Sequence, residues 1–376
     1  MINSKKIWLS SPHMGGHELH FIHEAFDTNW VAPLGANVDN FELDIAGYLG
    51  EDRYVAALSS GTSAMHLALI LCGVEQGDSV ICQSLTFSAS ANPIVYQGGM
   101  PVFVDSETDT WNMSPELMEE AVLHCIKKKK KPKAIIVVHL YGMPAKMDEI
   151  LNIADKYEIP VIEDAAEALG SSLNGRKCGT FSDFGILSFN GNKIITTSGG
   201  GALICKNEEL AARARFLATQ ARDNAPYYQH STIGYNYRMS NIIAGIGRGQ
   251  MQVLNERIEK RRQNNCFYRD SFKNMSGIAF QSAPDGNYYS NYWLTSILID
   301  PKEFGVTSEQ IRLAMEKENI ESRPLWKPMH LQPVFKEAPF FGSGISEKLF
   351  ETGLCIPSGS NLDQNDLNRV ADCFKN

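Results

Sequence analysis

Short apolar stretches alternate with longer amphipathic stretches over the first half of the chain. The apolar stretches are typical of buried strands, and they cover residues 54–58, 79–82, 100–104, 134–138, 159–162 and 202–205. Stretches with helical spacing lie between several of them, such as 147–157, and a further one follows at 208–221. Strands that alternate with helices in this way predict an α/β layered structure whose sheet is largely parallel.

The last third of the chain has a different pattern. A long helical stretch from about 241 to 268 is predicted to connect two domains. A strand at 293–298, a helix at 308–317 and a final helix follow it, which indicates a smaller α+β domain. We therefore expect a large domain over residues 1–250 and a small C-terminal domain over 251–376. Near the start, another helical pattern places Leu19, Ile22 and Phe26 on one side.

Composition narrows the class of protein. The 376 residues are 43% hydrophobic and 21% charged, as in globular proteins, and the formal net charge is −8 with a pI near 5.7. An acidic chain is a poor partner for nucleic acid or an anionic membrane. The eight cysteines include no C-x-x-C pair, and no apolar stretch is long enough for a signal peptide or a membrane span. These features predict a cytoplasmic protein with free thiols.

Candidate chemistry is concentrated between residues 161 and 201. Asp164 ends a predicted strand, where open α/β sheets place their ligand sites. Lys193 follows the turn pair Asn190-Gly191 and precedes two isoleucines, so its amine is expected to lose hydration and gain nucleophilicity. A carboxylate for a pyridinium nitrogen and a lysine for an aldehyde are what pyridoxal phosphate requires. The alternative is chance, because the chain has 43 acidic and 35 basic side chains.

Two further stretches fit this hypothesis without proving it. Residues 59–63 read Ser-Ser-Gly-Thr-Ser between a predicted strand and helix. Backbone N–H groups and hydroxyls there could hold a phosphate at a helix N-terminus, but Ser and Thr are also ordinary N-caps. Phe87, after the next strand, is either a core residue or a flat face for an aromatic cofactor.

Four histidines near the start raise the question of a metal site. His13, His17, His20 and His23 have partly helical spacing, but no cysteine accompanies them and a glycine pair separates the first from the rest. We therefore expect no metal. The apolar loop 29–35 is expected to pack on a neighbour or line a pocket.

Together these segments resemble the pyridoxal-phosphate-dependent sugar-nucleotide aminotransferases of the DegT/StrS family, in order and over nearly the whole chain. The resemblance rests on S-G-T-S, T-F, E-D-A-A-E-A, S-F-N-G-N-K, G-x-N-x-R and R-P-L-W-K-P-M-H. It implies the fold type I of aspartate aminotransferase, an α/β fold with a large mixed-sheet domain, helices on both faces and a smaller α+β domain. It also implies a homodimer with shared active sites.

The resemblance assigns roles to individual residues. Lys193 and Asp164 would be catalytic, as Schiff-base lysine and pyridinium partner. The other expected cofactor-binding residues are Gly61, Thr62, Ser63, Phe87, Glu167, Ser188 and Asn236, the last from the partner subunit. Many relatives have Gln or His where this chain has Glu167. The expected substrate-binding residues are His13, Met14, Asn190, Arg238, Trp326 and His330, with Trp30, Tyr237 and Arg323 as further candidates.

The motifs N-G-N-K-I-I-T-T-S-G-G-G, H-L-Y-G and S-P-H-M-G-G resemble the subgroup that aminates UDP-4-keto-6-deoxy-N-acetylglucosamine in bacillosamine-type pathways. The implied reaction moves an amino group from L-glutamate to C4 of that sugar. The alternatives are a dTDP- or GDP-linked ketosugar, a pyridoxal-binding regulator without turnover, and a lysine Schiff-base enzyme without pyridoxal. The aromatic residues also fit packing at a dimer interface.

Overall fold

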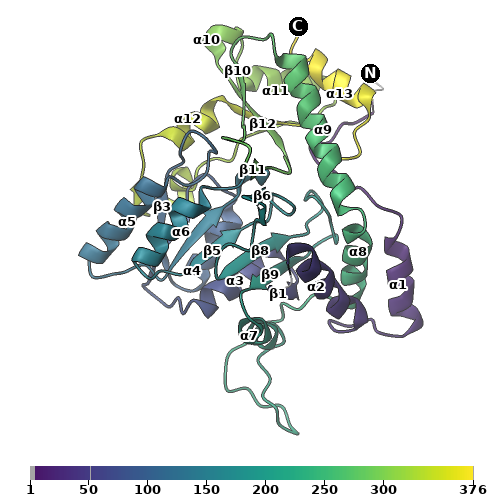
Figure 1. The fold of residues 1–376 in the computed structure, drawn as a ribbon, viewed down its shortest axis with the longest axis vertical. Coiled ribbons are helices and arrows are strands. Elements are labelled where there is room, and N and C mark those ends of the chain that lie inside the picture. The colour runs from purple at the N-terminus through teal and green to yellow at the C-terminus, as the bar shows by residue number, and fades with distance from the viewer. Residues whose placement is uncertain (1–4, 51, 376) are drawn as a thin grey trace.

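An eight-stranded sheet forms the centre of the protein (Figure 1). The structure is a computed structural model that describes residues 5–50 and 52–375. The strand order is β1-β9-β8-β5-β4-β2-β3-β14. Neighbouring strands are parallel except around β9, which runs antiparallel to β1 and to β8. The strands are β1 (Tyr54–Leu58), β2 (Ser79–Gln83), β3 (Met100–Val104), β4 (Ala134–Val138), β5 (Val161–Asp164), β8 (Phe184–Ser188), β9 (Gly201–Cys205) and β14 (Phe340–Phe341).

Helices cover both faces of this sheet because alternate side chains of each strand point to opposite sides. In β4, Ile135 and Val137 pack with α5 (Pro115–Lys127) and α6 (Met147–Lys156). Ala134 and Ile136 pack with α3 (Gly61–Leu71) and α7 (Glu208–Ala218) on the other side. The predicted mixed sheet with helices on both faces is confirmed.

The predicted long connecting helix is in fact two helices. The structure has α8 (Asn241–Met251) and α9 (Leu254–Phe272), separated at Gln252 and Val253, so the prediction of one continuous helix was wrong. In α8, a Cβ atom on Gly247 would lie 2.5 Å from the ring of Phe41, so this glycine allows close contact with α2 (Ala36–Leu49). Figure 1 shows α9 running from this region towards both chain ends.

Helix α1 (Glu18–Asp27) does not bury the apolar side that its sequence pattern predicts. Phe21 and Ala25 are buried against α8, whereas Leu19 and Phe26 are 66% and 58% exposed. In the loop that follows, Trp30, Val31 and Leu34 are also half exposed or more. These exposed apolar side chains are the outward apolar surface of α1 and its loop.

The C-terminal part forms a second, four-stranded sheet in the order β10-β12-β15-β13. Its strands are β10 (Ile278–Phe280), β12 (Thr295–Ile299), β13 (Arg323–Pro324) and β15 (Gly353–Ile356), and its helices are α10 (Pro301–Phe304), α11 (Ser308–Lys317), α12 (Ile345–Thr352) and α13 (Gln364–Asp372). Two further strands of the C-terminal part pair with strands outside this sheet. β14 extends the large sheet, and β11 (Tyr288–Tyr289) pairs with β6 (Ser172–Leu173), next to β7 (Arg176–Lys177). The domain boundary at residue 250 stays a prediction.

The carboxyl ends of four strands meet at one edge of the large sheet, since β1, β2, β5 and β8 all point the same way. The Ser-rich turn follows β1, Phe87 follows β2, Asp164 ends β5 and Ser188 ends β8. Open α/β sheets bind ligands at this edge. Within the described part of the chain, no helix is long and apolar enough to cross a membrane.

Candidate active site

A pocket of about 290 Å³ lies at this edge of the sheet. It collects segments that are far apart in sequence, from the Ser-rich turn to the C-terminal part. Nine of the residues expected at the site line it, namely Gly61, Thr62, Phe87, Asp164, Glu167, Ser188, Asn190, Lys193 and Trp326. Five of the six motifs therefore contribute residues to one cavity, and G-x-N-x-R is the exception.

The turn after β1 is both a helix cap and one end of the pocket. Oγ of Ser60 accepts a 3.0 Å hydrogen bond from the backbone N–H of Ser63, which caps α3. A helix has no internal partners for its first N–H groups, and those of Gly61 and Thr62 are at the pocket. The start of β9 packs tightly behind them, because a Cβ on Gly201 would lie 2.3 Å from the nitrogen of Gly61. This end is suited to an anion such as phosphate.

Asp164 lies at the floor of the pocket with its carboxylate held by neighbours. Its Oδ2 accepts a 2.7 Å hydrogen bond from Ser90, whose hydroxyl is 2.8 Å from that of Thr86. Its Oδ1 accepts a 3.2 Å bond from the backbone N–H of Ala166. The side chain is nearly buried, at 8% exposed for the residue. A carboxylate fixed in this way can pair with a cationic ring nitrogen.

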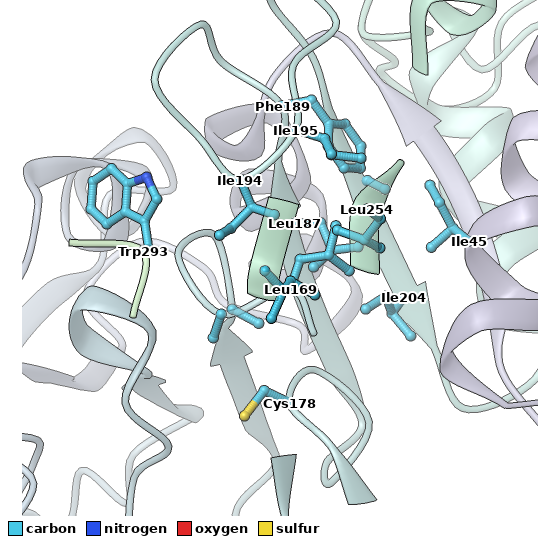
Figure 2. Packing of buried hydrophobic residues seen from close by; sticks show 14 of the residues in the cluster. Ile45, Leu169, Cys178, Leu187, Phe189, Ile194, Ile195, Ile204, Leu254 and Trp293 are labelled. Atoms are coloured by element: carbon cyan, nitrogen blue, oxygen red, sulfur yellow. The ribbon is translucent and has the colours of Figure 1, made fainter. Parts of the chain in front are cut away.

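Lys193 lies in the connection between β8 and β9. Its backbone is anchored by Phe189, Ile194 and Ile195, which belong to a buried cluster drawn in Figure 2 with Trp293 at one side. The Nζ atom lies 3.5 Å from Oε1 of Glu167 and 4.1 Å from the centre of the Trp293 ring. The amine is thus held between a carboxylate and an aromatic face.

Glu167 is buried and connects the lysine to the backbone of the H-L-Y-G segment. Its Oε2 accepts a 2.7 Å hydrogen bond from the backbone N–H of Tyr141. Burial raises the pKa of the Glu167 carboxyl, although Lys193 nearby acts to lower it. The raised pKa means that Glu167 holds a proton more readily than an exposed glutamate does.

Aromatic rings form the mouth of the pocket. Phe87 is 53% exposed, and its ring centre lies 5.4 Å from that of Trp326. Trp326 is fixed through its backbone N–H, which donates a 2.8 Å hydrogen bond to the hydroxyl of Tyr141. The exposed ring of Phe87 and the partly exposed ring of Trp326 give a flat ligand apolar faces to stack on.

Sequence reasoning missed three residues with clear roles here: Ser90, Tyr141 and Trp293. Ser90 follows Phe87 by one helical turn, so its spacing alone could have indicated it. Tyr141 is in the H-L-Y-G motif and has a φ of 55°, a conformation uncommon outside glycine. Trp293 reaches the pocket from the C-terminal part, and only the folded chain reveals that.

The other expected site residues do not line this pocket. Ser63 is in the hydroxyl cluster with Ser59 and Ser60. Nδ1 of His13 is 3.0 Å from the hydroxyl of Ser360, while Met14 is exposed.

The remaining three expected residues, Arg238, Asn236 and His330, have other partners. Arg238 pairs with the buried Glu42 and donates a 3.0 Å hydrogen bond to the carbonyl of Ala57. Asn236 is exposed, and its backbone pairs with Thr219 beside a loop that projects below α7 in Figure 1.

His330 does not line the pocket and has its partners in other segments of the chain. Its Nδ1 is 2.7 Å from the hydroxyl of Ser84, and its Nε2 is 3.1 Å from Oε1 of Glu347. The ring stacks on Phe340 at 3.6 Å between centres. His330 therefore links the end of β2 to the segment that carries Trp326.

The N-terminal histidines are not gathered around a common point. His17, His20 and His23 are exposed on or beside α1. Among the described residues, no group of three or more His, Cys, Asp or Glu side chains is arranged to hold a metal ion.

Comparison with known proteins identifies the family. The family model for DegT/DnrJ/EryC1/StrS aminotransferases matches residues 12–375. The chain belongs to this family. It is 51% identical over 372 residues to EpsN of Bacillus subtilis (strain 168), by name a pyridoxal phosphate-dependent aminotransferase, with 98% of this chain and 95% of EpsN covered. The GDP-perosamine synthase of Escherichia coli O157:H7 is 36% identical over 358 residues, with coverages of 95% and 94%.

A solved structure agrees with this assignment. DesI, crystallised in the presence of its TDP-sugar product, superimposes with a TM-score of 0.90 at 26% identity, and the match covers 100% of this chain and 93% of DesI. The predicted fold, the aminotransferase activity and the pyridoxal 5′-phosphate cofactor are thereby confirmed. A regulator without turnover and an enzyme without pyridoxal are set aside.

The pocket fits this cofactor on its own chemistry. One end presents the N-terminus of α3 and the hydroxyl of Ser188, the floor presents the Asp164 carboxylate, and one side presents the Lys193 amine. The end would bind an anion such as the phosphate group, and the Asp164 carboxylate would pair with a protonated ring nitrogen. The Lys193 amine would bind an aldehyde.

Proposed function

We propose that Lys193 and Asp164 are the catalytic pair of an enzyme that moves an amino group from L-glutamate to C4 of a nucleotide-linked 4-keto-6-deoxyhexose. The observation that carries the proposal is their convergence with the α3 N-terminus in one pocket. When bound, pyridoxal 5′-phosphate supplies an aldehyde for the amino group and a ring that accepts electrons. Lys193 would hold the cofactor covalently and, once free, carry the proton between donor carbon and cofactor at Nζ.

The other pocket residues bind and orient. Gly61, Thr62 and Ser188 would hold the phosphate group, and the Asp164 carboxylate would keep the ring nitrogen protonated. Phe87 would cover the ring. Glu167, which is buried and has a raised pKa, lies beside the amine and is expected to share its proton.

For the acceptor we propose a UDP-linked 4-keto-6-deoxy-N-acetylhexosamine. The support is the subgroup resemblance of the motifs around Lys193. Trp326 and Phe87 at the mouth offer apolar faces for a sugar, and Asn190 offers a polar edge. A second candidate is a GDP-linked 4-keto-6-deoxyhexose, favoured by the 36% identity to a GDP-perosamine synthase.

We further propose that the active enzyme is a homodimer with shared sites. Asn236 is exposed and does not line the pocket of its own subunit, as expected of a residue that acts in the partner's pocket. The apolar surface of α1 and its loop, with Leu19, Phe26 and Trp30 exposed, is suited to a second copy of the chain. Arg238 would serve the partner's site only by releasing Glu42.

The test of the acceptor is turnover of matched UDP-, dTDP- and GDP-linked 4-ketosugars with glutamate, with products identified by mass spectrometry. We expect the highest kcat/KM for the UDP-linked N-acetyl sugar. A higher value for the GDP sugar would favour the second candidate instead. Amination of none of these sugars, with a functioning glutamate half-reaction, would contradict the proposed acceptor class.

A further inference from the structure

Trp293 is held in place by a closed ring of hydrogen bonds that includes Asn192, the residue before Lys193. Arg261 donates a 2.7 Å bond to the carbonyl oxygen of Trp293 and a 2.9 Å bond to the hydroxyl of Ser10. The carbonyl oxygen of Asn192 accepts a 2.6 Å bond from Ser10 and a 2.7 Å bond from Nε1 of Trp293. These four residues come from four separate parts of the chain, and the ring includes the residue just before Lys193.

The charge within this ring is unusual. Arg261 is 1% exposed, and it donates hydrogen bonds to neutral oxygen atoms of Trp293, Ser358 and Ser10. Burial lowers the pKa of Arg261 to about 9, and Arg257 nearby adds to the effect. Burying a guanidinium in this way is costly, so the bonds it makes to Trp293 and Ser10 indicate that their positions matter.

The indole ring is oriented towards the amine of Lys193. Nζ lies 4.1 Å from the ring centre, well inside the range for a cation–π contact. The Trp293 residue is only 1% exposed, and its ring stacks against that of the buried Tyr141, with 6.5 Å between the ring centres. The face of an indole stabilises a desolvated cation more than an exposed one, and the side chain of Lys193 is only 13% exposed.

We propose that Trp293 is a positioning residue for Lys193, whose free amine it holds and stabilises as a cation on the indole face while its N–H fixes the backbone at Asn192. The inference rests on the proposed role of Lys193 as the cofactor-binding lysine. After the lysine leaves the cofactor, its amine has two partners that keep it close, the Trp293 face and the Glu167 carboxylate. The amine then stays within reach of the cofactor rather than turning outward.

Core packing is the competing explanation, because Trp293 also belongs to a buried apolar cluster (Figure 2). The two explanations differ in what they require of the ring. Packing depends on the volume of the side chain, whereas a cation–π contact depends on the negative charge of the ring face. Fluorine atoms on the indole withdraw that charge with little change in size.

The experiment compares full-length, cofactor-free protein carrying tryptophan with zero to several ring fluorines at position 293. The rate of Lys193 acetylation at one fixed pH near neutrality is measured by mass spectrometry of the peptide. Only the uncharged amine reacts, so we expect the rate to rise stepwise with each fluorine. Trp293→Leu should react about threefold to tenfold faster than the wild type. In the matched control, the same fluorinated tryptophans replace Trp111. Trp111 is buried but does not line the pocket.

The outcomes separate this inference from the assignment of Lys193. An acetylation rate that stays flat across the fluorinated series at position 293, or that rises equally at position 111, would overturn the role of Trp293. Borohydride reduction of the holoenzyme identifies the cofactor-bearing lysine independently. If that lysine is not Lys193 while the fluorine series is graded, the contact stands and the proposed function fails. Circular dichroism confirms that each protein remains folded.

Discussion

The hydroxyl of Ser90 donates a 2.7 Å hydrogen bond to Oδ2 of Asp164. Both residues are nearly buried, and Thr86 extends the contact through its own hydroxyl. Since a carboxylate with a fixed donor keeps one orientation, the Ser90 bond directs Asp164 into the pocket. Asp164 and its supporting hydroxyls therefore form one functional unit at the end of β5.

Replacing Asp164 with Asn removes the charge that favours a protonated ring nitrogen. We expect kcat to fall by orders of magnitude with the protein still folded, each factor of ten being about 1.4 kcal/mol of transition-state stabilisation. Ser90→Ala keeps the charge of Asp164 but removes the hydrogen bond that orients its carboxylate, and should lower kcat about tenfold. Stopped-flow rates of the glutamate half-reaction measure both. A fully active Asp164→Asn protein would rule out this role for the carboxylate.

Lys193→Ala is expected to fold, to bind the cofactor without a covalent bond and to lose transamination. Borohydride treatment of the wild type should leave the cofactor on the peptide that contains Lys193, as read by mass spectrometry. Lys177, which lies above the ring of Tyr48 away from the pocket, is the control, and Lys177→Ala should retain the covalent attachment. Attachment to a peptide without Lys193 would show that the assignment is incorrect.

Mixing two inactive proteins tests the shared sites. In a heterodimer of Lys193→Ala and Asn236→Ala subunits, one pocket has an intact lysine and an intact partner asparagine. Random exchange gives half heterodimers with one working site each, so activity should recover to about a quarter of the wild type. Native mass spectrometry verifies the exchange. If each variant alone is inactive and the exchanged mixture is too, Asn236 does not act across the interface.

Asp105 is expected to control stability in acid. It follows β3, and its carboxylate accepts hydrogen bonds of 2.9–3.0 Å from the backbone N–H groups of Ser343, Gly344, Ile345 and Ser346 at the start of α12. Burial acts to raise the pKa of Asp105, but the hydrogen bonds from Ser346 and the neighbouring backbone outweigh it and lower the pKa below its ordinary value.

Because the folded-state pKa is lowered, Asp105 stabilises the protein above the unfolded pKa of about 4, and this contribution is lost as the pH falls through the folded pKa. Asp105→Asn should reduce the free energy of unfolding at pH 7 by about 2 kcal/mol. The difference from the wild type should shrink below pH 4. Urea unfolding at several pH values measures this, with the exposed Asp109→Asn as control. A difference that does not change with pH would contradict the mechanism.

The strands and the turn motifs were predictable because their signals are local. Six predicted strands appear as β1, β2, β3, β4, β5 and β9. Parallel pairing then brings Phe87, Asp164 and the Ser-rich turn to one edge of the sheet, a consequence of topology that needs no side-chain detail.

Other features depend on contacts that no local pattern encodes. The apolar spacing in 241–268 does not reveal the break at Gln252 and Val253. The apolar side of α1 carries Leu19 and Phe26, which the structure leaves exposed, because periodicity identifies an apolar side but not what covers it. Trp293 reaches Lys193 through tertiary packing between residues a hundred positions apart.

The short strand β14 has a consequence for how the protein is made. Phe340 and Phe341 pair with Phe103 and Val104 of β3, so the last strand of the central sheet comes from near the end of the chain. During translation β3 is therefore an open edge until β14 has left the ribosome, and open apolar edges invite pairing with other chains. Nascent chains that stall before residue 340 should be the aggregation-prone species in cells and the ones that chaperones retain.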